Sequence, residues 1–220
     1  MKRPAFPPLL LTLVLFGPGC EELPRTYSTT RVQTYAPGEI VFQDDFERTE
    51  LGEAWTMTGK GASLSNGALT IHRAKNHPVW LVQDLPDDVE IEFDAWSDSR
   101  HGDIKVELCA DGESYATTVS YTATGYVVVF GGWKNTLDII ARRDEHGTDR
   151  IERPTLGVEP KRKYHFKITR KGSTLTWTVD GENPLVMDDP DPLTGPGQRG
   201  FGFNGWIART HFDDLVIRAL

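Results

Sequence analysis

Three acidic side chains alternate along one short stretch of the chain. Glu90, Glu92 and Asp94 are separated by single residues, so in an extended strand their side chains point to one face. Neighbouring members then lie ~6.8 Å apart, close to the separation of the two carboxyl groups in retaining glycosidases. This spacing suits acid–base chemistry on a glycosidic bond. A solvated polar strand face would produce the same pattern, so both interpretations stay open.

A tryptophan with polar neighbours follows two glycines in the segment GGWKN, which contains Trp133. An exposed tryptophan offers a flat apolar surface to the C–H groups of a sugar, and the nearby amide of Asn135 can bind sugar hydroxyl groups. Trp96 lies two residues after Asp94, so in an extended strand its side chain points to the same face as the three acids. We therefore predict Trp96, Trp133 and Asn135 as ligand-binding residues. The alternative is that Trp133 packs against the edge of the domain.

The position of His146 bears on the size of such a site. His146 lies thirteen residues after Trp133, and the apolar segment between them has the pattern of a strand. A strand of about seven residues spans ~23 Å. We therefore expect His146 and Trp133 not to share one small site.

A proline-rich loop carries three closely spaced aspartates. Asp188, Asp189 and Asp191 could supply oxygen ligands to Ca²⁺, although the EF-hand spacing is absent. The six histidines contain neither H-x-x-x-H nor H-E-x-x-H, so no transition-metal site is predicted. We expect no cofactor, with structural Ca²⁺ at these aspartates as the weak exception. Three solvated acids in a loop are the simpler interpretation.

Nucleotides and nucleic acids are disfavoured as ligands. The run GFGFNG at residues 200–205 matches the G-x-G-x-x-G pattern of dinucleotide-binding proteins. That function requires a helix directly after the glycines, whereas residues 206–212 alternate like a strand. The net charge of -8 also argues against nucleic acid, because an acidic surface repels a phosphate backbone.

Alternation of apolar and polar residues dominates the chain from residue 38 onward. It is clearest in residues 89–96 and 164–179, which we predict as half-buried strands with Phe93 and Trp177 facing inward. Turn pairs such as Asn66-Gly67 separate the strands. About a dozen strands at regular spacing, with no sustained helical period, predict an all-β fold. We expect an antiparallel two-sheet sandwich across residues 38–220.

The succession of these segments resembles a known fold. The stretches QDDFERTELGEAW, LSNGALTI, VEIEFDAW, YHFKITRKGSTLTWTVDGE and GFGFNGWIARTHFDDLVI are similar to concanavalin A-like jelly rolls. They resemble in particular the laminin-G-like and 3-keto-disaccharide-hydrolase-like domains of exported bacterial proteins. The resemblance covers residues 40–220 and implies a concanavalin A-like jelly roll. This superfamily includes lectins, glucanases and adhesive modules, so the resemblance leaves the activity open.

One member group of that superfamily bears on the acidic alternation. Laminarinase-type glucanases carry their catalytic acids as Glu-x-Asp-x-(x)-Glu along a strand, as nucleophile, helper and acid. Residues 90–94 of this chain have the order Glu-x-Glu-x-Asp instead. The match is therefore broken at both later positions, and Glu90, Glu92 and Asp94 remain catalytic candidates on their spacing alone.

The N-terminus has the features of an export signal. Lys2 and Arg3 precede the apolar residues 9–16, and Gly19-Cys20 resembles the lipobox of bacterial lipoproteins, in which the cysteine is acylated. We predict a signal peptide at residues 1–19, lipid attachment at Cys20 and a flexible tether across residues 20–37. The residues before Gly19 depart from the usual lipobox, and an ordinary secretory signal is the alternative. We expect an exported protein anchored by lipid to a bacterial membrane, in the periplasm or on the cell surface.

These patterns together predict a lipid-anchored domain that binds a carbohydrate or cell-envelope glycan without cleaving it. A glycoside-processing hydrolase of the keto-disaccharide-hydrolase-like kind is the first alternative, and a structural or protein-interaction lipoprotein is the second. An acid pair of raised pKa in a groove would favour the enzyme. Exposed tryptophan and amide groups would favour the lectin, and a large exposed apolar patch would favour the interaction protein.

Overall fold

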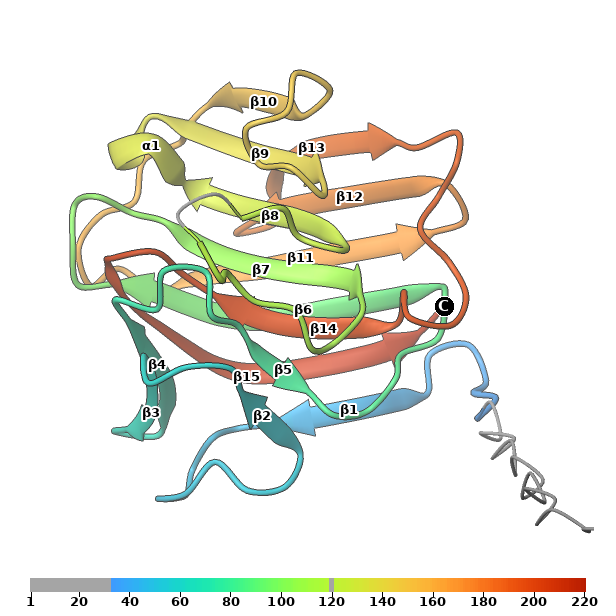
Figure 1. The fold of residues 1–220 in the computed structure, drawn as a ribbon, viewed down its shortest axis with the longest axis horizontal. Helices are drawn as coiled ribbons and strands as arrows, with labels where there is room; N and C mark the ends of the chain where they lie inside the picture. The colour runs from blue at the N-terminus through green and yellow to red at the C-terminus, as the bar shows by residue number, and fades with distance from the viewer. Residues whose placement is uncertain (1–32, 119–120) are drawn as a thin grey trace, which may run out of the picture. The chain divides into compact units, whose positions relative to one another are not determined.

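The computed structural model describes residues 33–118 and 121–220, which form two antiparallel β-sheets packed face to face (Figure 1). The eight-stranded sheet has the order β13 (Glu182–Asp188), β12 (Thr174–Val179), β11 (Tyr164–Lys171), β6 (Val89–Ser97), β15 (Arg209–Ala219), β4 (Ala68–His72) and β3 (Ala62–Ser65), with β1 (Ile40–Asp44) also paired to β15. The seven-stranded sheet has the order β10 (Ile151–Pro154), β9 (Leu137–Arg142), β8 (Tyr126–Gly131), β7 (Ile104–Ala110), β14 (Gly200–Asn204), β5 (Val79–Leu81) and β2 (Trp55–Met57).

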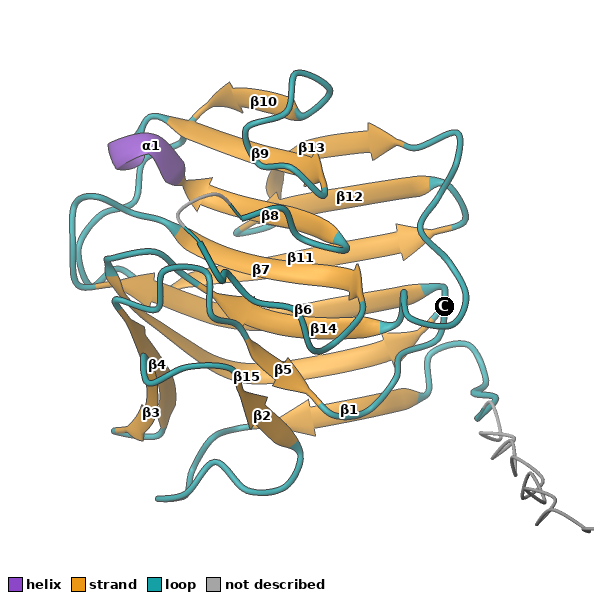
Figure 2. Cartoon of the chain, viewed as in Figure 1, coloured by secondary structure: helices purple, strands orange, loops and turns teal. Residues whose placement is uncertain are grey.

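Almost all regular structure in the described ranges is strand (Figure 2). The exception is α1 (Gly132–Asn135), a single turn in which Trp133 and Lys134 have left-handed backbone angles. No helix in these ranges is long and apolar enough to cross a bilayer. The predicted all-β, antiparallel two-sheet sandwich is therefore confirmed. The predicted signal peptide and Cys20 lie outside the described residues.

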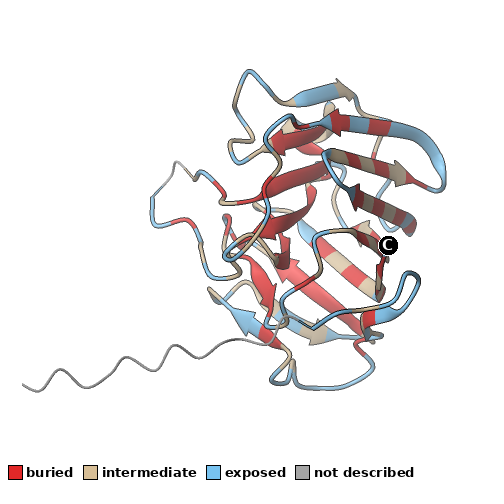
Figure 3. Cartoon of the chain, turned by 90° about the vertical axis from the view of Figure 1, so that its right-hand side faces the viewer, coloured by how far each residue is buried: buried red, intermediate tan, exposed pale blue. Residues whose placement is uncertain are grey.

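The core lies between the two sheets, and the alternation in the sequence places it correctly. Buried and half-exposed residues alternate along β6. Several strands of the domain show such stripes of buried and intermediate residues in Figure 3. Phe93 on β6 is fully buried and stacks on Phe166 of β11 with ring centroids 4.9 Å apart. Trp177 on β12 is also fully buried. The predicted inward faces of both strands are confirmed.

Two predicted hairpin turns form as the sequence indicates. Asn66 and Gly67 join β3 to β4 with φ values of 53° and 71°. Asp180 and Gly181 join β12 to β13 with φ values of 53° and 75°. Positive φ at both central positions matches the right-handed twist of the flanking strands, which is why Asn-Gly and Asp-Gly are favoured there.

The glycine-rich segment near the C-terminus differs in part from its prediction. Residues 200–204 form β14, but residues 206–208 form a turn rather than a strand, and β15 begins only at Arg209. Gly202 faces the fully buried ring of Trp80 on β5, where any side chain at Gly202 would overlap the indole. The glycine thus allows close packing of a strand, and the turn that follows frees Trp206 from the sheet.

The folded domain begins slightly earlier than predicted. Tyr35 lies within the predicted tether, yet its ring packs against the core and its hydroxyl accepts a hydrogen bond from Gln83 Nε2 at 2.8 Å. A tyrosine anchored in this way belongs to the domain. The contacts between the chain and its core therefore start before Gly38.

Candidate functional site

The outer face of the seven-stranded sheet is covered by its own loops. Val129 on β8 and Ile139 on β9 belong to a small second apolar cluster on this face, separate from the main core. Trp80 is fully buried there and donates its indole N–H to the carbonyl of Ser114, in the loop between β7 and β8, at 3.0 Å. Because loops cover this face, side chains that point outward from the sheet are shielded from solvent.

These loops leave an open cavity of about 1020 Å³ over the ends of β7 and β8. Three aromatic side chains line it, namely Tyr121, Trp133 and Trp206. The other lining residues are mostly polar or charged: His72, Asn76, Asp98, Ser99, His101, Asp103, Lys105, Thr122, Lys134, Asp144, Glu145, His146 and Arg209, with Val129, Ile207 and Ala208 as apolar members. A cavity that combines aromatic walls with convergent polar groups has the composition of a ligand-binding site.

A buried ion pair lies at the bottom of this cavity. The Lys105 ammonium is 2.6 Å from Glu145 Oε2 and donates to Asn76 Oδ1 at 3.0 Å. Lys105 and Asn76 are 3% and 4% exposed, although both line the cavity. With Asp103 they form what we call the cavity floor, composed of Asn76, Asp103, Lys105 and Glu145. Buried charges on the outer face of a sheet contribute little to stability, so their presence here favours a functional role.

A second carboxylate network lies beside the cavity floor, on the same face of β7. Glu107, two residues after Lys105 on β7, is fully buried and accepts hydrogen bonds from Tyr121 Oη at 3.0 Å and Asn204 Nδ2 at 2.6 Å. Burial raises the pKa of Glu107 to about 7, against the opposing effect of those two donors and of Lys105. Glu107 therefore fixes the orientation of Tyr121, whose side chain reaches the cavity.

Asp103 reaches the cavity because two glycines approach each other closely. Gly102 has a φ of 62°, and a side chain on it would overlap the carbonyl of Gly131, to which the Asp103 N–H donates at 3.0 Å. This contact brings the turn before β7 next to the turn that carries Trp133. Burial and the neighbouring Glu145 raise the pKa of Asp103, while Lys105 and the backbone N–H of Trp206 oppose the shift.

The loop between β9 and β10 corrects one expectation from the sequence. The rings of Trp133 and His146 lie 5.5 Å apart and both line the cavity, although a strand separates them in the chain. The chain reverses at Arg143, with a φ of 67°, and carries Glu145 back to Lys105 on the sheet. The prediction that Trp133 and His146 occupy different places is therefore wrong, because it did not allow for this reversal.

Charged groups at the edge of the cavity are engaged with one another. Arg209 lies 3.8 Å from Asp98 and donates to His72 Nδ1 at 3.4 Å. Burial, together with Arg209 and Arg73, lowers the pKa of His72 and favours its neutral form. This edge therefore adds little net charge to the cavity.

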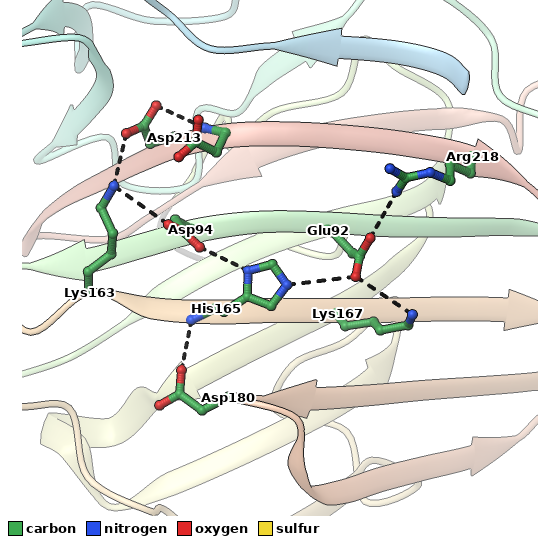
Figure 4. A network of polar contacts seen from close by, with 9 residues as sticks. Glu92, Asp94, Lys163, His165, Lys167, Asp180, Asp213 and Arg218 are labelled. Carbon is green, nitrogen blue, oxygen red and sulfur yellow. Dashed lines mark hydrogen bonds and ion pairs between the residues drawn. The ribbon is translucent and has the colours of Figure 1, made fainter. Parts of the chain in front are cut away.

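The predicted acidic triad lies on the other sheet. Glu90, Glu92 and Asp94 project from β6 on the outer face of the eight-stranded sheet, as their alternation predicted. Figure 4 shows Glu92 between Arg218 and Lys167, at 2.9 and 3.6 Å, and Asp94 accepting from His165 Nδ1 at 2.9 Å. None of the three acids lines the cavity. We call this surface, the outer face of β6 and β11, the ion-pair face.

The three predicted ligand-binding residues are separated by the fold. Trp133 lines the cavity, but an Arg150 guanidinium lies over its ring, 4.8 Å from the centroid. Asn135 clasps the backbone of Val158 instead, accepting at 2.8 Å and donating at 3.0 Å. Trp96 lies on the eight-stranded sheet, stacked on His211 with centroids 4.9 Å apart. Only Trp133 of the three belongs to the cavity.

The three loop aspartates already have partners of their own. Asp189 is buried and accepts from Tyr126 Oη at 2.7 Å and Arg142 Nε at 2.8 Å. Asp188 accepts from the Thr174 hydroxyl at 2.6 Å. Within the described ranges no group of three metal-ligating side chains converges on one point. Asp191 lies 3.6 Å from Arg142, so all three aspartates have protein partners, and structural Ca²⁺ at them stays a prediction.

Sequence reasoning missed the residues that build the cavity floor. Asp103, Lys105 and Glu107 alternate along β7 in the same manner as the acids of β6. The available signal was in the neighbouring strands, β8 and β9, where the runs YVVVF and IIA are apolar on both faces. A strand that is apolar on both faces is covered on both sides, so charges on an adjacent strand are buried with it.

Known structures with this arrangement of strands are numerous. The chain is similar to the carbohydrate-binding module CBM66 from Bacillus subtilis, with 15% identity, a TM-score of 0.59 and coverage of 76% of this chain and 96% of that one. It is also similar to the β-glucanase of Bacillus licheniformis, with 12% identity, a TM-score of 0.55 and coverage of 86% and 100%. The laminarinase of Rhodothermus marinus gives 12% identity, a TM-score of 0.57 and coverage of 83% and 97%.

At these identities the likeness concerns the fold. The structural neighbours are jelly-roll domains of carbohydrate-binding and glycosidase proteins, so the predicted concanavalin A-like jelly roll is confirmed. No protein-family model matches the sequence, and no curated protein does either.

Proposed function

We propose that this domain binds a carbohydrate in the cavity between Trp133 and Trp206. The observation that carries the proposal is the combination of aromatic walls with the polar cavity floor in one open space of about 1020 Å³. Ligand pockets typically measure ~300–1,000 Å³ and combine apolar walls with a few convergent polar groups. The jelly-roll neighbours, which include a carbohydrate-binding module, agree with this class of ligand.

The two tryptophans contribute differently to this proposal. Arg150 already covers part of the Trp133 ring, and His146 contacts it edge-on. Among the described residues no ring or cation lies over Trp206, which is half-exposed at the cavity. Trp206 is therefore the better platform for the C–H face of a sugar, and Trp133 lines the same cavity.

Binding experiments with single variants test the proposal. The full chain, purified in detergent, is screened against a glycan array, and each hit is titrated by calorimetry with the parent, Trp206→Ala and Trp133→Ala. Loss of a stacked aromatic anchor should weaken binding by at least ~2 kcal/mol. Trp96→Ala, on the other sheet, is the matched control and should bind as the parent does. Binding that survives both cavity variants would refute the proposal.

A second candidate function is hydrolysis of the bound glycoside. Burial raises the pKa of Asp103, whereas Glu145 accepts from the Lys105 ammonium at 2.6 Å, so of the two carboxyl groups that line the cavity Asp103 takes up a proton more readily. Glycosidases need this division, with one acid to protonate the leaving oxygen and one carboxylate to assist the incoming water. Release of reducing sugar from a bound glycan, abolished by Asp103→Asn, would favour this candidate. A glycan recovered intact would reject it.

The proposed setting is an exported protein held to a bacterial membrane by lipid on Cys20. The charged start, the short apolar core and the Gly19-Cys20 junction support it. Cys20→Ser should move the protein from the detergent-extracted fraction to the soluble fraction. Unchanged partitioning, with no lipid mass on the mature N-terminus, would rule out the anchor without affecting the proposal for the cavity.

A further inference from the structure

Three carboxylates surround a single ammonium at the bottom of the cavity. Asp103, Glu145 and Glu107 all act on Lys105, and together they raise its pKa although burial alone would lower it. Only Glu145 is within ion-pair distance of Lys105, at 2.6 Å. Even with Glu107 protonated, the carboxylates of Asp103 and Glu145 carry two negative charges against the single positive charge of Lys105. Lys105 is buried and the two carboxylates are partly buried, so a ligand in the cavity feels this excess of negative charge.

The remaining ionisable groups around the cavity do not cancel this excess. Arg209 is engaged with Asp98 and His72, and the pKa of His72 is lowered. Lys134 is exposed at the edge, and its charge is offset by Asp144, which also lines the cavity. His146 lies 3.7 Å from Glu145, and His101 is exposed to solvent. The cavity therefore remains electronegative at its floor around neutral pH.

Two more groups at the floor lack part of their hydrogen bonding. Asn76 is 4% exposed and lines the cavity, and its Oδ1 accepts from Lys105, but its Nδ2 has no partner among the described residues. The carboxylate of Asp103 has no ion-pair partner within the described ranges and receives only the backbone N–H of Trp206. The cavity floor thus presents a negatively charged hydrogen-bond acceptor, the Asp103 carboxylate, and a free amide donor, Asn76 Nδ2.

We infer that the cavity selects a glycan bearing a protonated amine, that is, an amino sugar, over neutral and acidic glycans. The amine would lie against the Asp103 carboxylate, and a neighbouring hydroxyl would accept from Asn76 Nδ2. Aromatic faces also attract cations, and among the described residues the ring of Trp206 has no cation over it, whereas the Arg150 guanidinium covers Trp133 at 4.8 Å from its centroid. This inference rests on the proposed carbohydrate binding and names the substrate class of the same site.

The test compares three probes that differ in charge. The full chain in detergent is titrated at neutral pH with a glucosamine tetrasaccharide, its N-acetylated counterpart and a tetragalacturonate. We expect the amine to bind about tenfold more tightly than the neutral probe, and the acidic probe to bind most weakly. Equal affinity for the first two probes, or tighter binding of the acidic probe, would overturn the inference and leave the proposed function standing. Failure of the amine probe to bind, with hits on the glycan array that depend on Trp206, would overturn the inference alone.

Asp103→Asn removes the negative charge of this side chain at the cavity floor while keeping its size and shape. Asparagine tolerates the φ of 68° at this position, and its Oδ1 still accepts the Trp206 N–H. The variant should lose the preference for the amine while binding the neutral probe as before. Glu92→Gln on the ion-pair face removes a carboxylate of the same domain far from the cavity and should keep the preference. A preference that survives Asp103→Asn would contradict the inference.

A measurement on the unmodified protein keeps the test decisive if that variant does not fold. Added salt screens the attraction between an amine and a carboxylate but hardly affects stacking of a neutral sugar on an aromatic ring. The preference of the parent for the amine should therefore shrink as salt is added. A preference independent of salt would assign it to shape rather than to charge and would also overturn the inference.

Discussion

The two outer faces of this sandwich carry charged side chains in the same alternating pattern, yet they differ in every other respect. On the ion-pair face, Glu92 lies opposite Lys167, and Asp94 lies opposite His165. The outer face of the seven-stranded sheet lies under loops, and we call it the covered face. There, Lys105 lies opposite Val129, and Glu107 lies opposite Val127. The first pattern places charges beside charges in water, where each pair contributes little.

The second pattern places charges beside valines under a layer of loops, where each must find a specific partner. An alternating row of acids therefore says little about function by itself. The residues that lie across from it in the sheet distinguish a solvated surface from a covered one. The following experiments test that distinction.

The largest difference is expected for the two lysines. Lys105→Met removes the buried ammonium that neutralises Glu145, whose side chain is 15% exposed, and should destabilise the domain by about 3 kcal/mol. Lys167→Met removes a lysine whose side chain is 41% exposed and should cost less than about 1 kcal/mol. Urea unfolding of both variants at neutral pH measures the difference. Similar losses of stability would mean that the two faces do not differ as described.

The pH dependence of stability should be set by the covered face. The pKa of Glu107 rises from 4.5 to about 7 on folding, so between these values the folded state binds more protons than the unfolded state. Stability should therefore fall as the pH rises through this window, by at most about 1.4 kcal/mol per pH unit for this group. Asp103, whose pKa is also raised, adds to the same trend.

Glu107→Gln should flatten that part of the profile. Denaturant midpoints of the parent and of the variant, measured from acid to neutral pH, provide the comparison. Glu92→Gln on the ion-pair face serves as the control and should follow the parent across the window. An unchanged slope in Glu107→Gln would show that its carboxyl group does not titrate differently in the folded and unfolded states.

A smaller effect is expected at Tyr121. Tyr121→Phe deletes one of the two side-chain donors to the buried Glu107 and should destabilise the domain by about 1–3 kcal/mol. The loss should be greater at alkaline pH, where the carboxylate most needs the donor, than at acidic pH. Thr176→Val, a similar deletion of a hydroxyl on the half-exposed β12, should cost less than about 0.5 kcal/mol. Thermal melting at two pH values distinguishes the two cases.

The smallest effect is expected for Glu92→Gln. Glu92 contacts Arg218 at 2.9 Å and Lys167 at 3.6 Å in a network open to solvent, so its charge should contribute less than about 1 kcal/mol. Its loss should also leave glycan binding unchanged. A strong effect on binding would move the functional site from the covered face to the ion-pair face.

The sequence predicts the strands, turns and core positions of this molecule much better than its cavity. Inward positions such as Phe93 and Trp177, and turns such as Asn66-Gly67, follow from local patterns that depend on a few neighbouring residues. The cavity depends on contacts between distant segments. Lys105 meets Glu145 only because the chain reverses at Arg143, and no local pattern encodes that meeting.

The wrong expectations for individual residues have the same physical cause, namely contacts and turns that a local pattern does not encode. Asn135 has a side chain suited to sugar binding, but the backbone of Val158 comes close enough to engage both ends of its amide. Trp133 lines the cavity because its turn carries it there, whereas the alternation in the sequence assigns Trp206 to a strand. Its role depends on the turn at residues 206–208, which separates β14 from β15.

The position of the last two strands governs when the fold can form. β14 lies between β7 and β5 in one sheet, and β15 pairs with β6, β4 and β1 in the other. Neither sheet is continuous without them, because each strand lies between others of its sheet. The pairing of β15 with β6 joins residues as far apart in the chain as Val89 and Ala219. A chain still being synthesised therefore holds two incomplete half-sheets with open edges. Folding must wait for the C-terminal residues, and such long-range pairing makes it slow and leaves the unfinished chain exposed to aggregation and proteolysis.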